Sequence, residues 1–75
     1  MILKNKRTKE TLNITLQEFK IHFAKEIRTA FESYKRTELA KPYFKIRNID
    51  ESDFYFDLQW NFNRHACSDW YIDST

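Results

Sequence analysis

An apolar stripe between residues 16 and 38 limits the fold more than any other feature of this 75-residue chain. Its members recur in steps of three and four, which keeps them within roughly 120° of a helix surface at about 100° per residue. They are Leu16, Phe19, Phe23, Ile27, Ala30, Phe31 and Tyr34. The pattern predicts one amphipathic helix, and its apolar side must be covered by a second layer of the fold.

Both ends of this helix carry sequence signals. Thr15 and Glu18 have the spacing of a capping box, in which the hydroxyl and the carboxylate each bond an otherwise unpaired backbone N–H. Pro42 ends the pattern, because its ring disfavours the helical conformation in the residue before it. We therefore expect the helix to stop near Leu39 or Ala40.

Three other segments favour β-structure. Residues 1–14 have apolar ends and a basic middle, which predicts a hairpin that turns near residues 8–9, with a mobile tip as the alternative. Residues 43–49 predict a strand, and the polar segment 50–53 predicts a turn after it. Residues 70–72 predict a short last strand or a segment that closes over the core.

The most regular alternation lies between residues 54 and 62. Apolar side chains occupy every second position, and five on one face of a strand need a large surface to cover them. These side chains, together with two from the preceding strand, are the predicted partners of the helix stripe: Phe54, Phe56, Leu58, Trp60, Phe62, Phe44 and Ile46. The predicted fold class is α+β, with one helix on a small antiparallel sheet in the order β-β-α-β-β, extended by the short last strand.

Length and composition restrict the classes of protein. Residues 1–75 are expected to form a single domain, whose core comes from seven Phe, four Tyr and two Trp. The chain has no glycine, which excludes glycine-rich phosphate loops, the dinucleotide fingerprint and the nucleophile elbow. Cys67 is the only cysteine, so an intramolecular disulfide and a thiolate zinc cluster are both excluded.

The start of the chain carries no secretory signal, and no apolar run approaches the ~20 residues of a membrane span. A cytoplasmic protein of a bacterium or a phage-infected host cell is expected, without a membrane association.

Charge is divided unevenly along the chain. Residues 1–47 carry twelve Lys and Arg against five Glu, a net charge of +7, whereas residues 48–75 carry one Arg against six acids, a net charge of −5. Such a division predicts either an electrostatically polar surface or two halves that attract each other in the fold.

The basic residues suggest a nucleic-acid-binding surface on the first hairpin and on the strand after Pro42. They could follow a phosphate backbone, and an aromatic ring on the same strand face could stack on a base. The candidate residues are Lys4, Lys6, Arg7, Lys9, Lys41, Tyr43, Lys45 and Arg47. Interspersed acids and the absence of a known nucleic-acid motif favour instead a basic face that is solvated or paired within the chain. Nucleic-acid binding is therefore the second hypothesis for the function.

Two sets of side chains have spacings that could suit a metal ion, namely His65, Cys67 and Asp69 in a loop predicted over residues 64–69, and Glu18, His22 and Glu26 along the helix. Neither set includes a CxxC or HxxxH pair. A polar loop and a solvated charge ladder are the better interpretations, so we expect no metal and no cofactor.

Catalysis has equally little support. Cys67 beside a histidine resembles a nucleophile with its base, but residues two apart rarely reach that geometry. The carboxylates of residues 50–53 lie in a turn where water solvates them, so nothing raises their pKa for acid–base work. We expect a protein that is not an enzyme.

A non-enzymatic protein-interaction or regulatory module is the first hypothesis. The polar side of the 54–62 strand is rich in amides, a short sheet edge could pair with a partner strand, and charged ends could steer a partner. A protein partner is therefore expected first, and nucleic acid and a homo-oligomer stay open as alternatives.

The segments LKNKRTKE, residues 3–10, and ITLQEF, residues 14–19, resemble the start of small uncharacterised proteins of phages and mobile elements. A composition rich in Lys, Asn, Ile, Phe, Tyr and Asp is typical of AT-rich bacterial or phage genomes. The resemblance implies a small accessory or regulatory protein, including one that blocks a host or defence factor.

Overall fold

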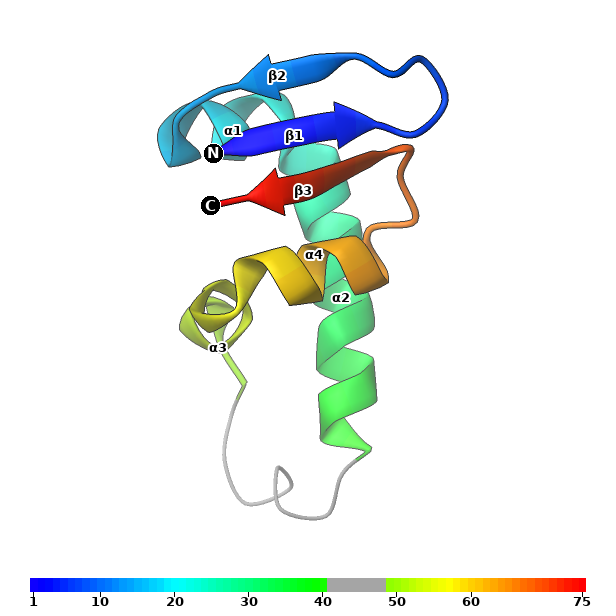
Figure 1. Cartoon of the computed structure of the whole chain (residues 1–75). Helices are drawn as coiled ribbons and strands as arrows, with labels where there is room; N and C mark the ends of the chain where they lie inside the picture. The colour runs from blue at the N-terminus through cyan, green and yellow to red at the C-terminus, as the bar shows by residue number, and fades with distance from the viewer. Residues whose placement is uncertain (41–48) are drawn as a thin grey trace.

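A three-stranded antiparallel sheet joins the first and last segments of the chain. The computed structural model describes residues 1–40 and 49–75. Strands β1 (Ile2–Asn5), β2 (Thr11–Asn13) and β3 (Trp70–Ser74) lie in the order β2-β1-β3, so the first strand is central (Figure 1). This arrangement confirms the predicted hairpin and the predicted last strand.

The hairpin turns without glycine because Asn5 organises it. Its side-chain oxygen accepts hydrogen bonds from the backbone N–H groups of Arg7 and Thr8, each at 2.9 Å. Lys9 then adopts a left-handed conformation with φ of 66°, and its N–H bonds the carbonyl of Asn5 at 2.9 Å. Asparagine side chains stabilise such turns by imitating the backbone, which explains how this turn forms.

The predicted long helix is present as two helices with a bend between them. α1 spans Leu16–His22 and α2 spans Ala24–Leu39, and Phe23 at the bend has φ of −114° and ψ of 26°. The Phe23 ring is buried at the bend and packs against Phe19 with centroids 5.3 Å apart. The bend therefore keeps both rings in the core. The end predicted at residues 39 or 40 is confirmed.

The predicted capping box is also confirmed. The Thr15 hydroxyl accepts a hydrogen bond from the Glu18 N–H at 3.1 Å, and the Glu18 carboxylate accepts one from the Thr15 N–H at 3.0 Å. These hydrogen bonds hold the pKa of the Glu18 carboxyl below its usual value of 4.5, because they favour its ionised form. The start of α1 is thus fixed by two neighbouring polar side chains.

The strand predicted over residues 54–62 is wrong, because this segment forms two short helices. α3 spans Glu51–Phe56 and α4 spans Leu58–His65, with a break at Asp57. An alternation of period two includes every fourth residue, so positions 54, 58 and 62 fit one side of a helix as well as one face of a strand. The observed order is accordingly β-β-α-α-α-α-β within the α+β class.

The turn predicted over residues 50–53 is instead the first turn of α3. The Asp50 carboxylate accepts hydrogen bonds from the N–H groups of Ser52 at 3.0 Å and Asp53 at 3.3 Å, and the Asp53 carboxylate bonds the Asp50 N–H at 3.0 Å. This is the reciprocal geometry of a capping box with aspartates in both positions. Most of the strand predicted over 43–49 lies outside the described residues, as do the predicted core residues Phe44 and Ile46.

The core lies between the sheet, α1, α2 and the inner side of α3 and α4 (Figure 1). Phe62 of α4 meets Phe19 at 5.1 Å between centroids, and Phe54 of α3 meets Tyr34 at 5.7 Å. Its buried apolar members are Leu3, Phe19, Phe23, Ala30, Tyr34, Ile49, Phe54, Leu58, Phe62, Ala66 and Ile72. Three predicted members, Leu16, Phe56 and Trp60, are instead exposed.

Candidate interaction surface

Two large aromatic side chains project into solvent from α3 and α4. Phe56 is 93% exposed and Trp60 is 61% exposed. At about 100° per residue, position 56 lies about 200° around α3 from position 54, and position 60 lies about 200° around α4 from both 58 and 62. The helical conformation therefore places Phe56 and Trp60 opposite the buried row. The alternation in the sequence assigned all five side chains at positions 54–62 to the core. The capping-box spacing of Asp50 and Asp53 is the signal that could have indicated a helix, and so one buried and one exposed set.

A groove of about 550 Å³ lies beside Phe56, between the beginning of α1 and the junction of α3 with α4. Leu16 and Lys20 line it from α1, and Phe56 lines it from α3. A second hollow of about 440 Å³, lined in part by Trp60, shares two of its lining residues with the groove. Leu16, Phe56 and Trp60 are named the apolar patch below. The apolar patch therefore borders two hollows on the outer side of α3 and α4.

Cationic side chains flank the apolar patch. The Lys20 ammonium lies 4.8 Å from the centroid of the Tyr55 ring, and the Arg64 guanidinium lies 5.7 Å from that of Trp60. Burial, with a smaller contribution from Glu51, raises the pKa of Tyr55 above its usual value of 10.0, so its hydroxyl stays protonated at neutral pH. Cations over aromatic faces contribute about 0.5–1 kcal/mol each at exposed sites. Tyr, Trp and Arg are also the residue types that dominate protein-binding hot spots.

The amides expected on a polar strand face are used inside the fold instead. Asn63 bonds both backbone groups of Ile72, accepting from its N–H at 2.7 Å and donating to its carbonyl at 2.9 Å. Gln59 donates to the carbonyl of Asp73 at 3.2 Å. These amides close the outer edge of β3, so they hold α4 against the sheet. The strand face on which these amides were expected does not form, because Gln59 and Asn63 both belong to α4.

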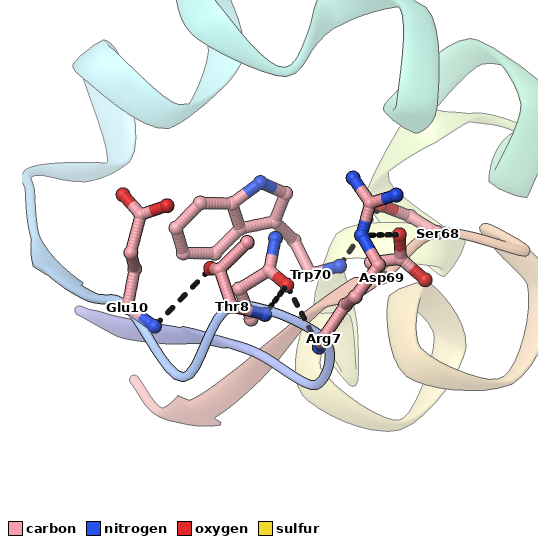
Figure 2. Close-up of polar contacts among 7 residues, drawn as sticks. Arg7, Thr8, Glu10, Ser68, Asp69 and Trp70 are labelled. Atoms are coloured by element: carbon pink, nitrogen blue, oxygen red, sulfur yellow. Dashed lines mark hydrogen bonds and ion pairs between the residues drawn. The ribbon is translucent and has the colours of Figure 1, made fainter.

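The basic hairpin is partly neutralised by the acidic end of the chain. Lys4 lies 3.5 Å from the Asp73 carboxylate, and Arg7 lies 3.5 Å from that of Asp69 (Figure 2). The uneven charge distribution therefore brings the two ends of the chain together at these pairs. Exposed ion pairs of this kind contribute only about 0–1 kcal/mol, so the anion of a partner can replace the carboxylate in either pair.

The remaining predicted nucleic-acid contacts divide into two groups. Lys6 and Lys9 are exposed near the hairpin turn, and the Lys6 ammonium lies 5.8 Å from the centroid of the Tyr71 ring. The others, Lys41, Tyr43, Lys45 and Arg47, lie outside the described residues. The described structure thus holds only the hairpin part of the predicted basic surface.

The three residues considered for a metal near the end of the chain have separate environments. His65 belongs to α4, not to the predicted loop, and its Nδ1 lies 2.9 Å from the Ser33 hydroxyl. Cys67 is exposed, and Asp69 pairs with Arg7. Within residues 1–40 and 49–75, no group of three or more His, Cys, Asp or Glu side chains is arranged to hold a metal ion.

Burial lowers the pKa of His65 below its usual value of 6.5, and the nearby Arg64 charge acts in the same direction. The imidazole is therefore neutral at pH 7, and its hydrogen bond to Ser33 joins α4 to α2. This contact gives His65 a structural role.

Comparison of the chain with protein-family models, curated proteins and solved structures found no match. Across the part of the chain that the structure describes, no helix combines the length and apolar character needed to cross a membrane.

Proposed function

We propose that this chain is a non-enzymatic protein-interaction module, and that its partner docks on the apolar patch. The observation that carries the proposal is the 93% exposure of Phe56, beside Trp60 and a groove. Burying one such side chain in an interface contributes about 1.5–3 kcal/mol. The two aromatic side chains together therefore offer a partner several kcal/mol of apolar stabilisation, which the isolated chain leaves unused.

The charges around the patch favour a partner with an apolar surface and an acidic rim. Lys20 lies on the α1 side of the patch and Arg64 on the α4 side, each already seated on an aromatic ring. Asp57 contributes one negative charge between the two hollows. Carboxylates on the partner would meet the two cations at the edge of the interface, where complementary charges mainly accelerate association and exclude wrong partners.

The absence of glycine-dependent catalytic loops supports a non-enzymatic role. The resemblance of residues 3–10 and 14–19 to small phage and mobile-element proteins supports an accessory or regulatory role, with a host or defence factor as the partner.

Affinity purification with the full chain tests the proposal. The comparison uses the natural chain, a Phe56→Ala/Trp60→Ala variant and an Ile21→Ala control, in lysates treated or not treated with nuclease. Ile21 is 69% exposed and lines neither hollow of the patch, so it matches the loss of apolar surface elsewhere. We expect one specific protein that the natural chain and the control retain after nuclease treatment and the double variant loses. Equal retention by the double variant, or no specific protein at all, contradicts the proposal.

Nucleic-acid binding through the hairpin is the second candidate. It is supported by the exposure of Lys6, Arg7 and Lys9 on one turn, and by an Arg7–Asp69 pair that a phosphate can replace. Replacing Lys4, Lys6, Arg7 and Lys9 together by Ala is then expected to abolish binding to duplex DNA. Four phosphate contacts predict a slope of about −3.6 in a plot of log affinity against log salt. Unchanged DNA affinity in the quadruple variant excludes this role for the hairpin.

A further inference from the structure

The two outer edges of the sheet are treated differently by the fold. β3 has its outer edge closed, because the Asn63 amide bonds the N–H and the carbonyl of Ile72. β2 is the other outer strand, and none of the helices or strands described for residues 1–40 and 49–75 continues the sheet beyond it (Figure 1). An open edge presents unpaired backbone groups to which an extended chain can bind.

The register identifies which groups of β2 are unpaired. The Ile14 N–H bonds the Met1 carbonyl at 3.0 Å, and the Asn5 N–H bonds the Glu10 carbonyl at 2.9 Å. Bonded and non-bonded residue pairs alternate along an antiparallel ladder, so Thr11 and Asn13 direct their backbone N–H and carbonyl groups away from β1. Among the described residues these groups have no hydrogen-bond partner.

A mainly apolar hollow of about 470 Å³ lies against this edge. Leu12 and Ile14 of the hairpin line it together with Phe23 and Trp70, and the helices contribute His22 and Glu26. Successive side chains of a strand point to opposite faces of the sheet. A strand added beside β2 would therefore place the residue opposite Leu12 into the hollow, while its backbone meets Thr11 and Asn13.

One carboxylate lines the hollow, and a second lies on the same face of the hairpin outside its lining. Glu26 lines it, and Glu10 is two residues before Leu12, so it belongs to the same face of the hairpin. Figure 2 shows the Glu10 carboxylate on the side of the strands where the Trp70 indole lies. In the described part of the chain, neither carboxylate has an ion-pair partner. A Lys or Arg of the bound segment is the complementary group.

We propose that the β2 edge binds an extended segment of a partner protein in antiparallel pairing. The segment has an apolar residue opposite Leu12 and a Lys or Arg two positions later, opposite Glu10. A second copy of this chain fits less well, because an antiparallel pair with Leu12 opposite Leu12 places Glu10 opposite the apolar Ile14, where no cation meets it. This surface is separate from the apolar patch, so each of the two proposals can fail without the other.

Nuclear magnetic resonance with the ¹⁵N-labelled full chain tests the inference. The probe is the blocked peptide acetyl-Thr-Ile-Thr-Lys-Thr-amide, whose Ile and Lys share one strand face. We expect saturable shifts of the Thr11 and Asn13 amide signals and of the Trp70 indole. A peptide with Ile and Lys adjacent, acetyl-Thr-Ile-Lys-Thr-Thr-amide, should bind at least about fivefold more weakly, because the two side chains then point to opposite faces.

Methylation of the central amide nitrogen of the probe distinguishes strand pairing from side-chain contact. It removes one N–H directed at β2 and keeps every side chain, so an affinity loss of about tenfold is expected. Equal binding of the methylated peptide, or shifts confined to Phe56 and Trp60, overturns the inference. Concentration-dependent shifts of Thr11 and Asn13 without peptide overturn it as well, because a second copy then occupies the edge.

Two variants test the same surface from the protein side. Asn13→Pro removes the outward N–H from the edge, so it should abolish peptide binding. The variant should still fold, because strands tolerate proline at edge positions whose N–H faces solvent. Glu10→Gln should weaken the Lys peptide several-fold and leave a peptide with Thr in place of Lys unaffected. Glu51→Gln, an exposed carboxylate on α3, is the matched control and should change neither. Equal loss for both peptides in Glu10→Gln contradicts the assigned contact.

Discussion

The inner and outer rows of α3 and α4 contain similar side chains in opposite environments. Phe54 and Phe62 are fully buried, and Leu58 is 8% exposed, whereas Phe56 and Trp60 on the outer row are 93% and 61% exposed. The rows interleave in the sequence at every second position. Their difference in exposure therefore arises from the position of each side chain around the axis of its own helix, and residue type alone does not reveal it. The inner row stabilises the fold, and the outer row is available for binding.

Removing a ring from the inner row should have the largest effect. Phe54→Ala is expected to lower the free energy of unfolding by about 3–5 kcal/mol, because the cavity it leaves is surrounded by packed rings. The Phe54 ring has neighbours at 5.7 Å in Tyr34 and Phe31 and at 5.4 Å in Tyr55, measured between centroids. Urea denaturation followed by far-ultraviolet circular dichroism measures the change. A loss below about 1 kcal/mol would show that the inner row is not the core.

Asn63 tests how α4 is held against the sheet. Asn63→Ala leaves the N–H and carbonyl of Ile72 without their side-chain partner, and unsatisfied buried groups cost about 1–3 kcal/mol. We expect a loss of that size in urea denaturation and faster hydrogen exchange of the Ile72 amide. Asn13→Ala is the control, because its side chain is exposed on the opposite edge, and it should stay within about 0.5 kcal/mol of the natural chain. Unchanged Ile72 exchange in Asn63→Ala would contradict the edge closure.

The first 40 residues were largely predictable because their signals are local. Thr15 and Glu18 fix a helix start through contacts three residues apart, and the apolar stripe has the helical period. The bend at Phe23 was not predictable, because it follows from packing against rings distant in sequence, including Trp70 at 5.9 Å between centroids.

Residues 50–65 were assigned wrongly because two patterns coincide there. Side chains that alternate at every second position also recur at every fourth, so they fit a strand and a helix equally. The capping pair Asp50 and Asp53 distinguishes the two, but in the sequence it is also typical of a turn.

The features of the candidate sites also differ in how far the sequence predicts them. The charge distribution anticipated the Lys4–Asp73 attraction, whereas the exposure of Phe56 depends on the helix assignment. The contacts of Asn63 depend on the fold as a whole.

A smaller effect on stability is expected from the protonation of His65, which is buried at the end of α4. Its pKa is lowered by burial in the fold, so between about pH 6.5 and that lowered value the unfolded chain binds more protons. Stability should therefore be constant above pH 7 and decrease as the pH falls below about 6.5. Urea denaturation between pH 7.5 and 5.5 measures this slope.

The matched variants are His65→Asn and His22→Asn. The first should remove the dependence on pH even if it lowers stability at every pH, because the slope and not the absolute value is compared. The second changes an exposed histidine and should keep the slope. A slope that survives in His65→Asn would assign the effect to another group.

The smallest change in stability is expected on the outer row. Phe56→Ala/Trp60→Ala should alter the free energy of unfolding by about 1 kcal/mol or less, because exposed side chains away from packed contacts contribute little. Within the described residues, the variant loses the contact of Arg64 with the Trp60 ring, which is worth about 0.5–1 kcal/mol in an exposed position. The same urea measurement as for Phe54→Ala allows a direct comparison. A loss above about 2 kcal/mol would place these rings in the packed structure and leave the apolar patch without a reason to bind a partner.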